Sequence, residues 1–108
     1  MNESQIIDRL KQGNQQAFKE IIQLYQDYVY TIALQMLKKK EMAEEVTQDV
    51  FVKVYQKIDT YESRAKFSTW LFTIVYRTAL NYLDKKKIYF TESDYTFDDG
   101  NETFLENI

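Results

Sequence analysis

Apolar side chains recur at helical spacing in three stretches of the 108-residue chain. The first stretch runs from Phe18 to Leu37, with apolar residues at i, i+3, i+4 and i+7. The second consists of Ala43, Val46, Val50, Val54 and Ile58, and the third of Leu71, Ile74, Val75, Thr78, Ala79 and Tyr82. This period predicts three amphipathic helices whose apolar faces pack against one another.

Residues at the ends of these stretches carry boundary signals. Asn14 is a plausible N-cap for the first long helix, and Gly13 can end a short preceding helix built on Ile6, Ile7 and Leu10. Ser68 is the expected N-cap of the third helix, which we expect to close on Lys85, Lys86 and Lys87. A fourth, short helix is therefore predicted at the N-terminus.

Two segments lack the helical period. Residues 59–67 separate the second and third predicted helices, and we expect an ordered loop there. Residues 88–108 mix acidic and aromatic side chains without a stripe, and we expect a mobile acidic interdomain linker. The predicted fold is therefore all-α: a compact bundle of three main helices plus a short N-terminal helix over residues 1–87, followed by the linker.

The composition removes several classes of protein. The chain has no cysteine and no histidine, which excludes disulfides, thiolate metal sites and catalysis by histidine. It has no proline and only two glycines, so few of the residues that favour tight β turns are present. The chain has neither a signal-peptide pattern nor an uncharged run of about 20 residues. We therefore expect a cytoplasmic protein that is not an enzyme and that needs no metal or cofactor.

The formal net charge of −3 hides a strong asymmetry. Residues 1–63 carry 8 basic and 10 acidic residues, while residues 64–87 carry 6 basic residues and one acidic residue. Residues 88–108 carry six acidic residues and no basic one. A mildly acidic chain thus contains one compact basic segment, which is followed by an acidic one.

Carboxylates gather at the start of the second predicted helix, at Glu41, Glu44, Glu45 and Asp49. Solvated acids are favoured there by the helix dipole, and a patch that docks a basic partner would need the same residues. A catalytic or metal site would need converging ligands from other helices, and the sequence offers no second inward-facing set. The residues alone leave the first two interpretations open.

Cations and aromatic residues alternate between residues 61 and 77. Phosphates require positive charge and unpaired bases require flat faces for stacking, so this combination suits single-stranded nucleic acid. The alternative is that the aromatic residues belong to the core and the lysines cap a helix. Because Leu71, Ile74 and Thr78 already fill one stripe, Trp70, Tyr76 and Arg77 cannot all point inward.

Three motifs in this order resemble region 2 of bacterial sigma factors of the extracytoplasmic-function class (group 4). They are Ala17-Phe18 with Leu24-Tyr25, the stretch Ala43-Glu44-Glu45-Val46-Thr47-Gln48-Asp49-Val50-Phe51, and Phe67-Ser68-Thr69-Trp70-Leu71-Phe72-Thr73-Ile74. The stretch from Thr78 to Asp84 also resembles the last helix of region 2. The resemblance covers about residues 14–87, and each motif is weak by itself.

The resemblance implies a transcription initiation factor with two partners, RNA polymerase core and the promoter −10 element. Glu45, Gln48 and Asp49 match family positions that bind the clamp coiled coil of the β′ subunit. In the family, the loop and the last helix recognise and melt the −10 element, and the loop holds a base flipped from the non-template strand. The expected DNA-binding residues are Tyr61, Ser63, Arg64, Lys66, Trp70, Tyr76, Arg77, Lys85, Lys86 and Lys87. An anti-sigma factor is a further candidate partner.

The sequence departs from the family pattern in two places. Arg77 stands where many members carry asparagine, which leaves the base preference at that step open. Nothing after residue 87 resembles region 4, so we expect a fragment that stops in the linker, the alternative being a natural factor without region 4. The rival function is a helical protein–protein module, an adaptor or anti-sigma-like partner, with no nucleic-acid role.

Overall fold

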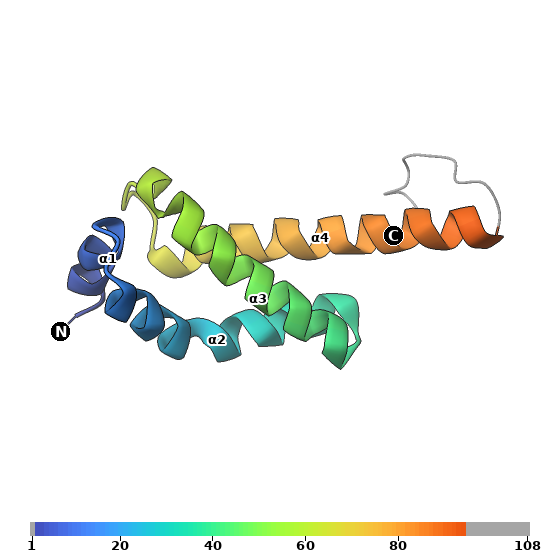
Figure 1. Cartoon of the computed structure of the whole chain (residues 1–108), viewed down its shortest axis with the longest axis horizontal. Helices are drawn as coiled ribbons and strands as arrows, with labels where there is room; N and C mark the ends of the chain where they lie inside the picture. The colour runs from blue at the N-terminus through green and yellow to red at the C-terminus, as the bar shows by residue number, and fades with distance from the viewer. Residues whose placement is uncertain (1, 95–108) are drawn as a thin grey trace.

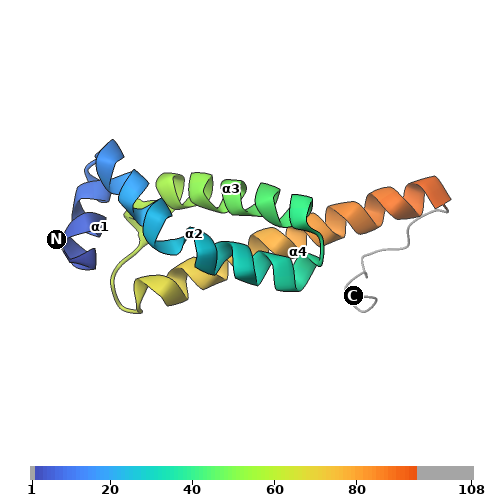
Figure 2. The same cartoon turned by 90° about the horizontal axis from the view of Figure 1, so that it is seen from below.

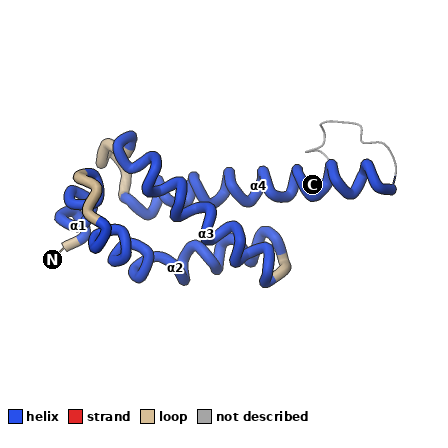
Figure 3. Tube along the Cα trace, in the orientation of Figure 1, coloured by secondary structure: helices blue, strands red, loops and turns tan. Residues whose placement is uncertain are grey.

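Four α-helices and one 3₁₀ turn make up the computed structural model, which describes residues 2–94 and their side chains as far as Asp84 (Figure 1). The elements are α1 (Glu3–Lys11), α2 (Gln15–Leu37), α3 (Lys40–Lys57), η1 (Ile58–Thr60) and α4 (Phe67–Asp94). No strand occurs within residues 2–94 (Figure 3). The all-α fold with three main helices and a short N-terminal helix is thereby confirmed.

The end of α1 and the start of α2 lie where the sequence predicts. The backbone N–H of Gly13, at φ +85°, donates to the carbonyl of Leu10 at 2.8 Å and closes α1. The side chain of Asn14 accepts from the backbone N–H of Ala17 at 2.9 Å and opens α2. A reciprocal capping box between Asn2 and Gln5, which was not predicted, opens α1.

The reversal between α2 and α3 takes only two residues. Lys38 adopts a left-handed conformation, φ +66°, and Lys39 is extended. The backbone N–H of Lys38 donates to the carbonyl of Leu34 at 2.8 Å, so the last turn of α2 is capped by the backbone. Because the turn is so short, α3 runs back along α2 (Figure 2).

The core lies where α2, α3 and α4 meet. All five residues of the second predicted stripe are buried, as are Leu71, Val75 and Ala79 of α4. Val29 and Ala33 of α2 have no exposed surface. Burial of a valine or leucine side chain stabilises a fold by about 1.5–3 kcal/mol, so this three-helix contact carries most of the hydrophobic stabilisation.

A polar link joins α3 to α4 inside this contact. The Nζ of Lys53 donates to Oγ1 of the buried Thr78 at 3.1 Å. The Thr78 hydroxyl in turn donates to the backbone carbonyl of Ile74 at 2.7 Å. Thr78 therefore satisfies its polar group although it occupies the apolar stripe.

The bounds of α4 correct two expectations. The helix begins at Phe67, and the carbonyl of Lys66 accepts from the backbone N–H of Trp70 at 3.1 Å, so the prediction of Ser68 as N-cap was wrong. It continues to Asp94, past the predicted end at Lys87, and projects beyond the other helices (Figures 1 and 2). No glycine or proline occurs between Phe67 and Asp94 to stop it. Residues 95–108 of the predicted linker lie outside the described residues.

Two kinds of site can be checked on the described part of the chain. No helix there combines the length and the apolar character that a membrane span requires. Within the same residues, no group of three or more potential metal-ligating side chains comes together.

Candidate nucleic-acid interface and docking face

The loop between η1 and α4 is tied to itself and to the core by Tyr61. The Tyr61 hydroxyl donates to the carbonyl of Ala65 at 2.6 Å, which closes the loop over residues 61–65. Ser63 adopts a left-handed conformation, φ +65°, at the tip. Residues 62–66 are all exposed, so the loop presents its side chains outward from a fixed base.

Tyr61, which we expected among the DNA-binding residues, is a buried residue at the base of the loop. Its side chain is only 6% exposed. Its ring packs against those of Phe67 and Trp70, with centroids 5.6 and 5.2 Å away. An aromatic side chain can either pack in the core or stack on a base, so the residue type alone does not distinguish the two positions. In this structure Tyr61 supports the loop from below.

Four aromatic rings form one cluster at this end of the bundle. Phe67, 1% exposed, lies at its centre and contacts Tyr25, Tyr61 and Trp70 with centroids 5.3 to 5.6 Å away. Such tilted and edge-to-face pairs each add about 0.5–1.5 kcal/mol to the burial of the rings. The cluster therefore fixes the loop and the start of α4 against α2.

Two side-chain bonds attach α1 to the aromatic cluster. The Nζ of Lys11 donates to the carbonyl of Tyr61 at 2.6 Å and lies 5.8 Å from the centre of its ring. The Tyr25 hydroxyl donates to Oε2 of Glu3. Burial, and then the bond to the Glu3 carboxylate and its charge, raise the pKa of Tyr25 well above its ordinary value. Tyr25 therefore stays protonated and keeps donating.

The loop and the exposed side of α4 carry the cations and aromatic rings that the sequence assigned to DNA. Arg64 forms an ion pair with Glu62 at 3.3 Å, but its side chain is 88% exposed, so the pair contributes little and the guanidinium can exchange partners. Lys66 and Arg77 are exposed, and so is Ser63. Trp70 is only partly buried.

A stacked aromatic pair on α4 joins this surface, and only one of its two residues was predicted to bind DNA. Phe72 and Tyr76 lie one turn apart, with ring centroids 6.0 Å apart and planes inclined by 20°. They are 43% and 45% exposed. The i, i+4 spacing of the pair, outside the buried stripe, was the signal for Phe72. The structure does not describe the side chains of Lys85, Lys86 and Lys87, which are part of α4.

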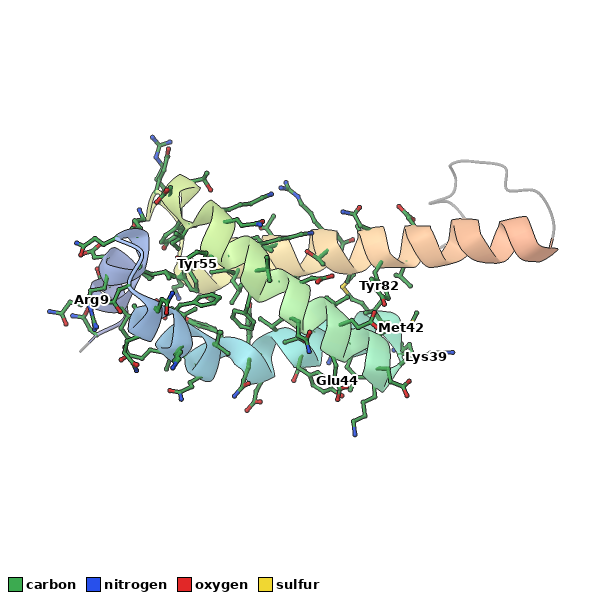
Figure 4. The ribbon with its side chains drawn as sticks, in the orientation of Figure 1. Arg9, Lys39, Met42, Glu44, Tyr55 and Tyr82 are labelled. Atoms are coloured by element: carbon green, nitrogen blue, oxygen red, sulfur yellow. The ribbon has the colours of Figure 1, made fainter. Side chains whose placement is uncertain are left out.

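The predicted docking residues share one exposed side of α3. Glu45, Gln48 and Asp49 stand at i, i+3 and i+4, and all three are exposed. Together they form what we call the acidic face. Glu44, labelled in Figure 4, and Gln48 border a depression of about 310 Å³ between α3 and α2. Gln48 therefore connects the acidic face to the groove between the two helices.

An apolar depression of about 300 Å³ adjoins the acidic face and was not predicted. Phe18 and Ile22 of α2 line it together with Phe51 and Val52 of α3. Val52 is 53% exposed. Gln48 borders both depressions, so the acidic and apolar surfaces are continuous. This depression was not predicted, because Phe51 and Val52 are not among the apolar residues whose spacing predicted α3.

A larger depression of about 540 Å³ lies between α1 and the loop, and we call it the loop pocket. Its walls are residues 61 and 63–68 on one side, α1 on the other, and Tyr25 of α2. Figure 1 shows α1 at the same end of the molecule as this loop. Charged side chains border the pocket on both sides.

Comparison with known proteins decides the family. Residues 21–88, most of the bundle, match the family model described as "Sigma-70 region 2". The chain belongs to the sigma-70 region 2 family. This confirms the resemblance that the three motifs carry, and the matched residues include the acidic face, the loop and the start of α4.

Several curated relatives of this region 2 domain are named sigma factors. SigW of Bacillus subtilis, an ECF RNA polymerase sigma factor, is 36% identical over 75% of this chain and 43% of its own length. The RNA polymerase sigma-H factor of Pseudomonas aeruginosa is 27% identical over 91% of this chain and 51% of its own length. The ECF RNA polymerase sigma-E factor of Escherichia coli is 31% identical over 72% of this chain and 40% of its own length. The chain thus spans about half the length of these relatives or less.

A solved structure matches the fold of this region 2 domain closely. It is the NMR structure of an engineered region 2 of sigmaE in complex with GTAAAA, and its TM-score is 0.73 at 30% identity. The match covers 82% of this chain and 97% of the other. The arrangement of helices is therefore that of a region 2 domain that was solved in complex with GTAAAA.

The buried position of Tyr61 leads to a stability prediction. Tyr61→Phe removes only the bond to Ala65, so we expect the free energy of unfolding to fall by about 1 kcal/mol. Tyr61→Ala also empties the space between Phe67 and Trp70, and we expect a decrease of about 3–5 kcal/mol. Urea denaturation followed by circular dichroism measures both. An unchanged unfolding midpoint for Tyr61→Ala would contradict the core position.

Proposed function

We propose that this region 2 domain belongs to a transcription initiation factor of the extracytoplasmic-function class, which docks on RNA polymerase core and recognises and melts the promoter −10 element. The observation that carries the proposal is the separation of two surfaces on different elements. The acidic face lies on α3, while the exposed cations and rings lie on the loop and α4. The similarity to a region 2 structure in complex with GTAAAA supports the second surface.

The acidic face has the chemistry for a basic, partly apolar protein partner. Three polar or charged side chains at helical spacing beside an apolar depression resemble the polar rim and apolar centre of many protein interfaces. The family positions of Glu45, Gln48 and Asp49 bind the clamp coiled coil of the β′ subunit, and we assign that contact to them. The depression lined by Phe51 and Val52 would add apolar area to it.

The loop and α4 form the surface to which we assign the DNA. Unstacking bases costs a few kcal/mol per step. Stacking on an aromatic side chain returns about 1–3 kcal/mol per base, and the exposed pair of Phe72 and Tyr76 offers such a surface. Arg64, Lys66 and Arg77 would contact phosphates, or in the case of Arg77 the guanine edge. The loop pocket would hold a base flipped from the non-template strand.

Docking and DNA binding have to act together in this scheme. A net charge of −3 gives the free chain little long-range attraction for DNA. Bound to polymerase core, the loop would be held over the upstream fork at a high effective concentration. The chain makes and breaks no covalent bond in this role, and the proposed site of action is the cytoplasm.

The rival function, a helical protein–protein module without a nucleic-acid role, accounts for the acidic face equally well. It gives no reason for arginine, lysine and stacked aromatic rings to be exposed together on the loop and α4. Salt-dependent binding of single-stranded −10 DNA, with and without core polymerase, separates the two functions.

Charge reversal tests the docking contact. Glu45→Lys with Asp49→Lys places two cations opposite a basic partner, and we expect the affinity for purified RNA polymerase core to fall at least 100-fold. Circular dichroism should stay unchanged because both side chains are exposed. Asp59→Lys, at an exposed acid of η1, is the control and should bind normally. Normal core binding by the double variant would overturn the docking assignment.

Removal of the exposed arginines tests the DNA contact. In holoenzyme with Arg64→Ala or Arg77→Ala, we expect core binding to persist but permanganate reactivity of promoter thymines to drop. Each substitution removes one cation that would contact a phosphate. The slope of the logarithm of the DNA-binding constant against the logarithm of the salt concentration should therefore become shallower by about 0.7 for single-stranded DNA. Lys19→Ala removes an exposed cation of α2 as a control. Wild-type melting by both arginine variants would place the DNA site elsewhere.

A further inference from the structure

The helix α1 lies outside the matched family domain, which begins at residue 21, yet it forms one wall of the loop pocket. Glu3, Ser4, Ile7 and Asp8 line this wall at i, i+1, i+4 and i+5, which is one side of a helix. Ile6 and Leu10, on another side, are buried in the core. The placement of the wall is therefore fixed by the packing of α1.

Two hydrogen bonds hold α1 in place beside the pocket, one to α2 and one to the loop. Glu3 accepts the hydroxyl of Tyr25 on α2, and Lys11 donates to the carbonyl of Tyr61 at 2.6 Å. The buried Ile7 lies between them along α1 and also lines the pocket. A ligand that enters the pocket therefore meets a preorganised surface, and no helix has to be ordered to bind it.

The two walls carry opposite charge. Arg64 and Lys66 border the loop side, whereas Glu3 and Asp8 border the α1 side. A nucleotide has the matching asymmetry, because its phosphate is an anion and its base edge carries neutral donors and acceptors. The cations can hold the phosphate, and the carboxylates are then left to meet the base edge.

Carboxylates discriminate among bases because they only accept hydrogen bonds. Glu3 uses one oxygen for Tyr25, and a carboxylate has about four acceptor sites, so capacity remains. Adenine, cytosine and guanine each offer an exocyclic amino group, and acidic side chains commonly accept from the amino group of cytosine. Thymine has no amino group: its pairing edge offers a single N3–H donor between two carbonyl oxygens, and these oxygens would repel a carboxylate.

We infer that the carboxylates of Glu3 and Asp8 on α1 determine the specificity of the loop pocket, which takes a flipped base bearing an exocyclic amino group and rejects thymine. The inference rests on the proposed function, since it names which bases the same DNA-binding surface accepts. It makes α1 a part of promoter recognition, although the family match does not include it.

The test measures binding of the full chain to GTAAAA and to variants with each of the four bases at each position, by fluorescence anisotropy. At the one position whose base enters the loop pocket, we expect the oligonucleotide with thymine to bind about tenfold more weakly than those with adenine, cytosine or guanine. In Glu3→Gln with Asp8→Asn the thymine probe should gain affinity, so that the ratio falls to about two or less. Glutamine still accepts from Tyr25, which preserves the packing of α1.

A matched control removes the same charge elsewhere. Asp27→Asn with Glu41→Gln, both exposed and outside the loop pocket, should raise affinity for all probes alike and keep the tenfold ratio. Probes that bind with no thymine penalty at any position, or a penalty that persists in the Glu3 and Asp8 variant, would overturn the inference alone. Failure to bind any probe, even with core polymerase present, would overturn the proposed function along with it.

Discussion

The packing of Phe67 against three other aromatic rings is the contact on which the arrangement of this domain depends. Phe67 is the first residue of α4 and is 1% exposed, so the direction in which α4 leaves the bundle is set by this contact. Tyr25 brings α2 to the cluster and Tyr61 brings the loop. Because Glu3 and Lys11 attach to those two tyrosines, α1 is held through the same cluster. Cavity formation there would disturb four elements at once.

The same packing explains how a small domain can present two separate binding surfaces on different helices. Buried residues alternate with exposed ones at helical spacing, so each helix contributes one side to the core and another to solvent. The acidic face uses the exposed side of α3, and the rings of Phe72 and Tyr76 use that of α4. Docking by one face leaves the other free to meet DNA, as the proposed function requires.

The sequence predicted the helices well because their period and caps are local properties. Gly13 and Asn14 were assigned correctly from neighbouring residues, since a left-handed φ and an N-cap bond involve only one turn. The burial of Tyr61 was not predicted, because it depends on ring contacts with Phe67 and Trp70 that no local pattern encodes. The loop pocket was missed for the same reason, because its two walls come from segments that lie far apart in the sequence, residues 3–8 and 61–68.

The central claim, that the loop and α4 bind DNA while α3 does not, is tested most directly by an NMR titration of the ¹⁵N-labelled chain with GTAAAA. Chemical-shift mapping suits weak binding and reports every amide of the domain separately. We predict shifts along the loop from Tyr61 to Ser68 and on α4 around Phe72 and Arg77, with the amides of Glu45 to Asp49 unmoved. Shifts confined to α3, or spread evenly over the bundle, would contradict the claim.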